Sequence, residues 1–149
     1  MISKILVPTD GTKASKKALD YAIGLSKQTN ASVIILGVVD KGDFVAQALP
    51  ADAANIHLRL PIEDYLGQIV NGYLINAEKQ CKKKGLKPAT VIRSGHPVEE
   101  IVKEARRSKS DLIIIGSHGK GAIESAVLGS VTYGLLHKNT KYPVLVIRG

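Results

Sequence analysis

The stretch LIIIGSHGKGAIESAVLGSVTYG, Leu112–Gly134, joins a run of strand-forming residues to a segment with five glycines. Leu112–Ile115 is short and wholly apolar, which is typical of a strand that is buried on both faces of a parallel sheet. Glycines directly after such a strand let the backbone approach a neighbouring group closely and turn N–H groups towards it. The stretch therefore predicts a buried parallel strand that ends in a ligand-binding loop.

Short apolar runs alternate with amphipathic helical patterns along the chain, and this alternation predicts βαβ units with right-handed crossovers. The expected fold is α/β: one Rossmann-like domain over residues 1–149, with an open five-stranded parallel sheet in the order 3-2-1-4-5 and helices on both faces. The predicted strands are Lys4–Val7, Ser32–Val39, Thr90–Arg93, Asp111–Ile115 and Val144–Ile147, and the predicted helices are Thr12–Thr29, Ile62–Gly85, Val98–Ser108 and Val131–His137.

The segment Lys41–Pro61 interrupts this alternation. It contains Gly42, Pro50 and Pro61 and mixes polar with apolar residues. We expect a long surface loop between the second strand and its helix, with a helical turn around Ala51–His57. Loops of this length in compact domains are often functional.

The composition is that of a globular protein, with 44% hydrophobic residues, 4% aromatic residues and a formal net charge of +8. Basic charge suits nucleic acid, anionic membranes or small anions. The densest clusters, Lys82–Lys84 and Arg106–Lys109, fall at predicted helix ends, where cations complement the helix dipole. With so few aromatic residues a stacking platform for single strands is not expected, and nucleic acid is not the expected partner.

Cys81 is the only cysteine, which excludes an intramolecular disulfide and a cysteine-based zinc site and fits a reducing compartment. It falls on the apolar stripe of a predicted helix, so we expect a packed thiol. No apolar run approaches the length of a membrane span. We therefore expect a cytoplasmic protein without a membrane partner.

Two predicted strand ends carry unusual residues. The first strand is followed by Pro8-Thr9-Asp10-Gly11-Thr12, and the fourth by Gly116-Ser117-His118-Gly119. An open parallel sheet binds ligands beyond the carboxyl ends of its strands, where the strand order reverses. These two loops would face each other there if the first and fourth strands are neighbours.

Gly129 and Ser130 open the last predicted helix, whose free N–H groups and positive end form an anion site. The hydroxyls of Ser130 and Thr132 would add donors. The pattern describes a phosphate cradle without the lysine of a P-loop. From the residues alone, turn geometry for the glycines and an N-cap role for Ser130 stay open as alternatives.

The spacing Gly116-x2-Gly119-x9-Gly129-Ser130 resembles the nucleotide-binding motif of the universal stress protein family, in its ATP-binding branch. KILVPTDGT resembles the first strand and loop of the family, SDLIIIGSHG its fourth strand, and GSVTYGLLHKNTKYPVLVIR its last helix and strand. The resemblance covers nearly the whole chain and is weakest over Lys41–Pro61. One departure is Gly11, where family members often have serine or a larger residue.

This resemblance implies an adenine nucleotide, ATP above all, lying across the carboxyl edge of the sheet. Asp10 would accept hydrogen bonds from the ribose or help to hold Mg²⁺ or Mn²⁺ bound with the phosphates, although the residues alone also allow it to cap the first helix. Pro8 and Thr9 would line the nucleoside, and Val38 would pack against the adenine. The residues implied around the ribose and phosphates are Gly116, His118, Gly119, Gly129, Ser130, Val131 and Thr132.

The function implied by the resemblance is that of an ATP-binding regulatory protein of the stress response. Hydrolysis would be slow at most, because the sequence offers no strong base or arginine finger, and no catalytic residue is assigned. An ATPase or autophosphorylating enzyme on the same fold is the alternative, with Ser130 or Thr132 as phosphoryl acceptor. A basic nucleic-acid-binding domain is a third hypothesis, motivated by the net charge alone.

The fifth strand would lie at an edge of the sheet in the expected order. An exposed edge as apolar as Val144–Ile147 is a pairing hazard, and antiparallel pairing with the same strand of a second copy covers it. We therefore expect a homodimer through residues 143–148, and the family resemblance implies the same dimer.

Overall fold

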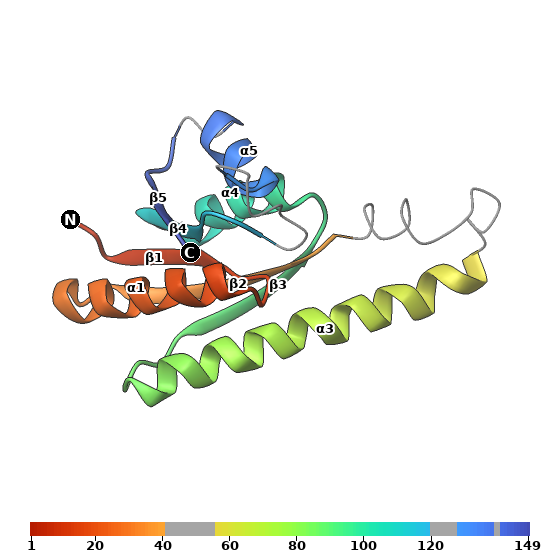
Figure 1. The fold of residues 1–149 in the computed structure, drawn as a ribbon, viewed down its shortest axis with the longest axis horizontal. Helices are drawn as coiled ribbons and strands as arrows, with labels where there is room; N and C mark the ends of the chain where they lie inside the picture. Colours follow the sequence, from red (N-terminus) through yellow and green to blue (C-terminus); the bar gives the residue numbers. More distant parts are fainter. Residues whose placement is uncertain (41–55, 120–127, 139–140) are drawn as a thin grey trace.

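The structure is a computed structural model that describes residues 1–40, 56–119, 128–138 and 141–149, with the backbone alone over 56–62. Strands and helices alternate along these residues (Figure 1). The strands are β1 (Lys4–Pro8), β2 (Ser32–Val39), β3 (Ala89–Ser94), β4 (Leu112–Gly116) and β5 (Val144–Ile147), and the helices are α1 (Lys13–Thr29), α3 (Ile56–Lys83), α4 (Pro97–Ser108) and α5 (Ser130–Lys138).

The strands form one parallel sheet in the order β3-β2-β1-β4-β5, as the sequence predicted. β1 lies at the centre, with Ile5 opposite Val33 of β2 on one side and Leu112 of β4 on the other. After β1 the chain places β2 and then β3 on one side of it, and it then crosses to the other side of β1 to place β4 and β5. The order therefore reverses between β1 and β4, and ligand sites of such sheets lie beyond the carboxyl ends of the strands at that point.

Helices cover both faces of the sheet because successive side chains of each strand point to opposite sides (Figure 1). On one face α1 and α3 pack against Ile5 and Val7 of β1. On the other face α4 and α5 pack against Leu6. All three of these β1 side chains are fully buried, which explains why the strand reads as a continuous apolar run.

Helix α1 begins where the sequence predicted, with Thr12 as its N-cap accepting a hydrogen bond from the backbone N–H of Ser15. It ends at Asn30, which adopts the left-handed conformation with φ 62°. Tyr21 is apolar in the helical pattern of α1 but is 52% exposed, so it is not part of the buried stripe. The buried stripe is made mainly of small residues such as Ala18 and Ala22, and Tyr21 lies beside it.

Helix α3 begins at Ile56, six residues before the predicted start at Ile62. Proline removes one backbone donor and usually marks a boundary, but the helix runs through Pro61. Helix formation is cooperative, so one lost hydrogen bond near an end does not stop a helix of 28 residues. The predicted loop Lys41–Pro61 is therefore too long by its last six residues, and its remainder, with most of the predicted turn Ala51–His57, lies outside the described residues.

The C-terminal half of α3 packs against the sheet through Cys81, which is fully buried. Burial raises the pKa of the Cys81 thiol to about 11, with smaller contributions from the carboxylates of Glu78 and Asp20. The thiol is therefore neutral and packed, as predicted. Gly85, with φ +77°, lies just beyond the end of the helix. Among the helices that the structure describes, none is long and apolar enough to cross a membrane.

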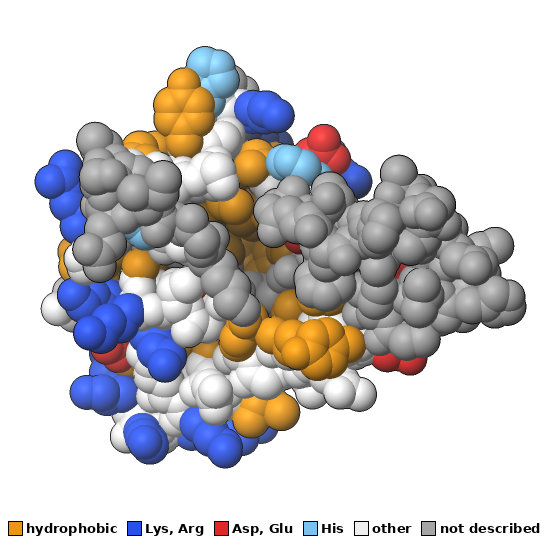
Figure 2. All heavy atoms as spheres, turned by 45° about the vertical axis from the view of Figure 1, so that its right-hand side comes forward, with side chains coloured by type: hydrophobic (Ala, Val, Ile, Leu, Met, Phe, Trp, Pro, Cys, Tyr) orange, Lys and Arg blue, Asp and Glu red, His pale blue; other side chains and the backbone are white. Residues whose placement is uncertain are grey.

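Basic side chains gather on the outer surface of the α1 and α3 layer. Figure 2 shows Lys and Arg side chains concentrated at the lower left, the side of α1 and of the C-terminal end of α3. Lys82 and Lys83 occupy the last turn of α3, and Arg106 and Arg107 the last turn of α4. Both clusters are thus at helix ends, where they complement the helix dipole as predicted.

Candidate functional site

The loop between β1 and α1 is ordered by its own side chains. The backbone N–H of Thr9 donates to the carbonyl of Leu36 at 2.9 Å, so the loop leaves β1 still paired with β2. Oδ1 of Asp10 accepts from the backbone N–H of Thr12 at 3.1 Å and from its hydroxyl at 2.6 Å. Thr12, and not Asp10, is the N-cap of α1, so the capping alternative for Asp10 was wrong. Asp10 fixes the turn before the helix.

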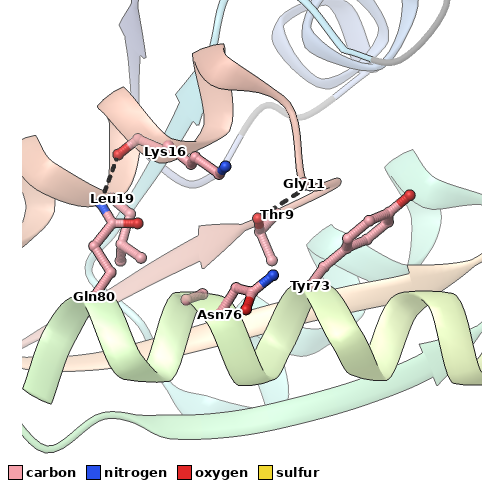
Figure 3. A pocket seen from close by; sticks show the side chains of 8 residues that line it. Thr9, Gly11, Lys16, Leu19, Tyr73, Asn76 and Gln80 are labelled. Carbon is pink, nitrogen blue, oxygen red and sulfur yellow. Dashed lines mark hydrogen bonds between the residues drawn. The ribbon is translucent and has the colours of Figure 1, made fainter.

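Gly11 occupies a position that no other residue fits without strain. Its φ is +79°, and a methyl group added to it would stand 2.5 Å from Cε1 of Tyr73. Figure 3 shows the Tyr73 ring reaching from α3 towards the β1–α1 loop. Tyr73 therefore fills the space that a larger residue at position 11 would take. The sequence does not reveal this contact directly, and Gly11 in place of a larger residue is the one sign of it.

The end of β4 is held by backbone contacts. A methyl group on Gly116 would stand 2.8 Å from the carbonyl carbon and oxygen of Ala14, so this glycine allows α1 to pack against β4. Ser117, 1% exposed, donates its N–H to the carbonyl of Ile147 at 2.8 Å and accepts the N–H of Gly129 at 2.7 Å. Ser117 thus joins β4 to β5 and to the start of α5. The sequence prediction omitted it, and only its place directly after the buried strand pointed to it.

The two loops lie side by side, as the sequence predicted for neighbouring first and fourth strands. A methyl group on Gly119 would stand 2.9 Å from Oδ2 of Asp10, and one on Gly129 would stand 3.0 Å from the backbone N of Gly119. Because both residues lack a side chain, the Asp10 carboxylate lies next to Gly119, and Gly119 lies next to Gly129 at the start of α5.

Helix α5 begins at Ser130, and the backbone N–H of Tyr133 donates to the carbonyl of Gly129 at 2.9 Å. Gly129 is thus the N-cap, and an N-cap role for Ser130 was wrong. The exposed Ser130 and the partly buried Val131 lie in the first turn, where backbone N–H groups lack partners within the helix. Thr132 is 2% exposed and donates its hydroxyl to the carbonyl of Gly116 at 2.8 Å. Its hydroxyl anchors α5 to β4, in contrast to the expected role as a phosphate donor.

The other sequence-predicted residues lie at the same edge. Pro8 is buried and is the last residue of β1. Val38 lies in β2 two residues beyond Leu36, the partner of Pro8 in the sheet, and opposite Arg93 of β3. Nδ1 of His118 lies 2.9 Å from Oγ of Ser117. Among the described residues, no three His, Cys, Asp or Glu side chains come together in a group that could hold a metal ion.

These features define a doubly wound, Rossmann-like α/β protein whose glycine-rich loops meet at the point where the strand order reverses. The family model for the universal stress protein family matches residues 1–148. The chain belongs to the universal stress protein family, a family of stress-response proteins.

Relatives are similar to the chain over nearly its whole length. Universal stress protein MJ0531 of Methanocaldococcus jannaschii is 36% identical over 99% of this chain and 83% of its own length. The solved structure of MJ0577 from the same organism superposes with a TM-score of 0.83 at 31% identity, covering 100% of this chain and 97% of that one. A universal stress protein solved in complex with cAMP superposes with a TM-score of 0.70 at 25% identity, covering 98% and 97%.

Gly116 and Gly119 should differ in what an added methyl group does to stability. Gly116→Ala places the methyl against the backbone of Ala14, so we expect a loss of about 1–3 kcal/mol in the free energy of unfolding. Among the described atoms, the methyl group of Gly119→Ala meets the end of a side chain, Oδ2 of Asp10, and no backbone atom, so we expect a loss below about 1 kcal/mol. Urea unfolding followed by circular dichroism measures both. Equal losses in the two variants would show that the packing of α1 on β4 does not set the role of Gly116.

The contact between Gly11 and Tyr73 should appear as coupling in a double-mutant cycle. Gly11→Ala loses stability both from its positive φ and from collision with the ring. In a Tyr73→Ala background the collision is absent, so we expect the cost of Gly11→Ala to fall by about 1–3 kcal/mol. The free energies of unfolding of the four proteins test this. Strictly additive losses would mean that the ring does not restrict position 11.

Proposed function

We propose that the chain is an ATP-binding regulatory protein, with the adenine nucleotide at the carboxyl edge of the sheet between β1 and β4. The observation that carries the proposal is the approach of Gly119 to the Asp10 carboxylate and of Gly129, just before the first turn of α5, to the backbone of Gly119. A carboxylate and the positive end of a helix, with side-chain-free glycines at positions 119 and 129 beside them, suit the two halves of a nucleotide. The cAMP complex of the 25%-identical relative supports an adenine ligand.

The proposed roles follow from the chemistry of each group. The first-turn N–H groups of Ser130 and Val131 and the positive end of α5 would bind phosphate oxygens, with the exposed hydroxyl of Ser130 as a further donor. Gly119 and Gly129 would let the phosphates approach the backbone, and His118 would lie beside them. Gly116 would act indirectly, by letting α1 close against β4.

The nucleoside would lie on the β1 side of the edge, lined by Pro8 and Thr9 and packed against Val38. Asp10 would accept hydrogen bonds from the ribose. A carboxylate repels phosphate directly, so Asp10 would approach the phosphates only through a divalent cation. Mg²⁺, which binds proteins through one or two carboxylates together with substrate phosphates, fits this donor set, and Mn²⁺ would serve in the same way.

If the protein instead phosphorylates itself, the position of Thr132 argues against this residue as the phosphoryl acceptor. Its hydroxyl is buried and bonded to the carbonyl of Gly116, so it is poorly placed to accept a phosphoryl group. Ser130 is exposed and stays the candidate acceptor. We favour the regulatory role, in which bound nucleotide changes a partner surface and hydrolysis is slow at most. Single-turnover cleavage of labelled ATP well above background would favour the enzyme instead.

Calorimetry with ATP, AMP and GTP tests the proposed binding. We expect ATP to bind the folded protein, and Gly129→Val to weaken it at least tenfold, because the added side chain presses on the backbone N of Gly119. Gly24→Val is the matched control, because among the described residues no atom outside the adjoining helix backbone lies within 4 Å of a methyl group at that exposed position. Absence of ATP binding by folded wild-type protein, or equal binding by Gly129→Val, would refute the proposal.

We also propose that two copies pair through residues 143–148. β5 lies at the edge of the sheet, and Val144–Ile147 are only partly buried. The carbonyls of Pro143 and Ile147 bond to β4, so the N–H of Val146 should point away from it. Sedimentation equilibrium at micromolar concentration should give twice the chain mass of 15.9 kDa. Val146→Pro should weaken the dimer by removing that outward donor. A monomer mass for the wild-type protein would contradict the pairing.

A further inference from the structure

β3 forms the other edge of the sheet, and no strand among the described residues pairs with its outer side (Figure 1). The N–H of Gly95, directly after the strand, donates to the carbonyl of Val39 in β2 at 3.0 Å. Because backbone groups alternate sides along a strand, the N–H and carbonyl groups of Thr90, Ile92 and Ser94 point away from β2. All three residues are exposed, Ile92 by 44%. The edge thus offers a row of backbone donors and acceptors to which a further strand can add.

Two arginines lie beside this edge, on the face of the sheet that α4 covers. Nε of Arg93 in β3 and Nη1 of Arg107 in α4 both donate to Oε2 of Glu104, at 3.0 and 3.3 Å. Glu104 is 4% exposed, whereas the side chains of the two arginines are 40% and 44% exposed. One carboxylate thus positions two guanidinium groups, each of which has further N–H donors. The pair keeps an excess positive charge and suits a second carboxylate from solvent.

The chain that leads into β3 is also basic. From Lys79 to Val98 the sequence has six lysine and arginine residues and no aspartate or glutamate. Lys83, Lys84 and Lys87 are exposed in this segment. Charge commonly protects an exposed edge strand, and here it has a single sign. Two copies of this edge would bring like charges together, so the charge disfavours pairing between copies and favours an acidic partner.

We propose that the β3 edge binds an extended acidic segment of a partner protein, which adds to the sheet as a further strand. Side chains of an added strand alternate between the two faces of the sheet. On the α4 face, acidic side chains of the partner bind Arg93 and Arg107. On the opposite face, apolar side chains pack against Ile92. The proposal does not rest on nucleotide binding, because none of these three residues is assigned to the nucleotide site.

Hydrogen exchange of the isotope-labelled full chain, followed by NMR, tests whether a strand adds. The probe is a capped peptide of about eight residues in which valine and glutamate alternate, and the control peptide alternates valine with lysine. In the free protein the inward N–H of Arg93 should exchange slowly and the outward N–H of Ile92 quickly. We expect the glutamate peptide to slow exchange at Ile92 at least tenfold in a saturable manner. The lysine peptide should leave it unchanged.

Substitutions separate the backbone contact from the charge contact. Ile92→Pro removes the outward N–H without removing a bond to β2, and Ile92→Ala loses the same side chain but keeps that N–H. We expect Ile92→Pro to bind the glutamate peptide at least tenfold more weakly than Ile92→Ala. Arg107→Gln should raise the Kd about fivefold, the effect of losing about 1 kcal/mol of exposed ion pairing. Arg106→Gln is the matched control and should leave the Kd unchanged, because this exposed residue points about 100° around α4 from Arg107.

The proposal would be overturned if the glutamate peptide did not bind, or if it bound without slowing exchange at Ile92. Equal effects of Arg107→Gln and Arg106→Gln would show that the arginine pair does not recognise the acid. Slow exchange at Ile92 in the free protein that is lost on dilution would place a second copy at the edge instead. A duplex oligonucleotide that displaces the peptide at physiological salt would assign this surface to nucleic acid.

Discussion

The close approach of α1 to the carboxyl end of β4 is the constraint on which the edge of the sheet depends. Gly116 lies against the backbone of Ala14, where even one methyl group would collide. This contact holds the start of α1, and with it the β1–α1 loop, beside the residues that follow β4. Asp10 and Gly119 meet as a consequence. The proposed nucleotide site, whose residues lie more than a hundred positions apart in the sequence, thus depends on a backbone packing contact.

Hydrogen bonds then fix the other side of the edge. Ser117 ties β4 to β5 and to Gly129, and Thr132 ties the first turn of α5 back to Gly116. Among the described side chains, no buried polar atom lacks a hydrogen-bond partner. The candidate phosphate-binding turn is therefore held in place before any ligand arrives, which lowers the entropic cost of binding. The Thr132 hydroxyl therefore holds the edge in place, and the exposed Ser130 is left to contact a ligand.

The sheet could be predicted from the sequence because each strand and helix is encoded by a pattern of residues that are neighbours in the chain. Runs such as Leu112–Ile115 and the helical stripes between them determine a parallel sheet, and β1 next to β4 brings Asp10 to Gly119. Contacts between distant residues could not be predicted in this way. The Tyr73 ring on Gly11 and the bonds of Ser117 depend on the final packing. The early start of α3 was missed because a local rule for proline was applied to a long cooperative helix.

A crystal structure of the chain with bound ATP and Mg²⁺ would test the central claim most directly. We predict phosphate oxygens at the backbone N–H groups of Ser130 and Val131, and the ribose at the carboxylate of Asp10. We also predict that Gly119 and Gly129 will lie close to the phosphates. Nucleotide at another surface, or an edge that stays closed to a ligand at saturating ATP, would contradict this account of the molecule.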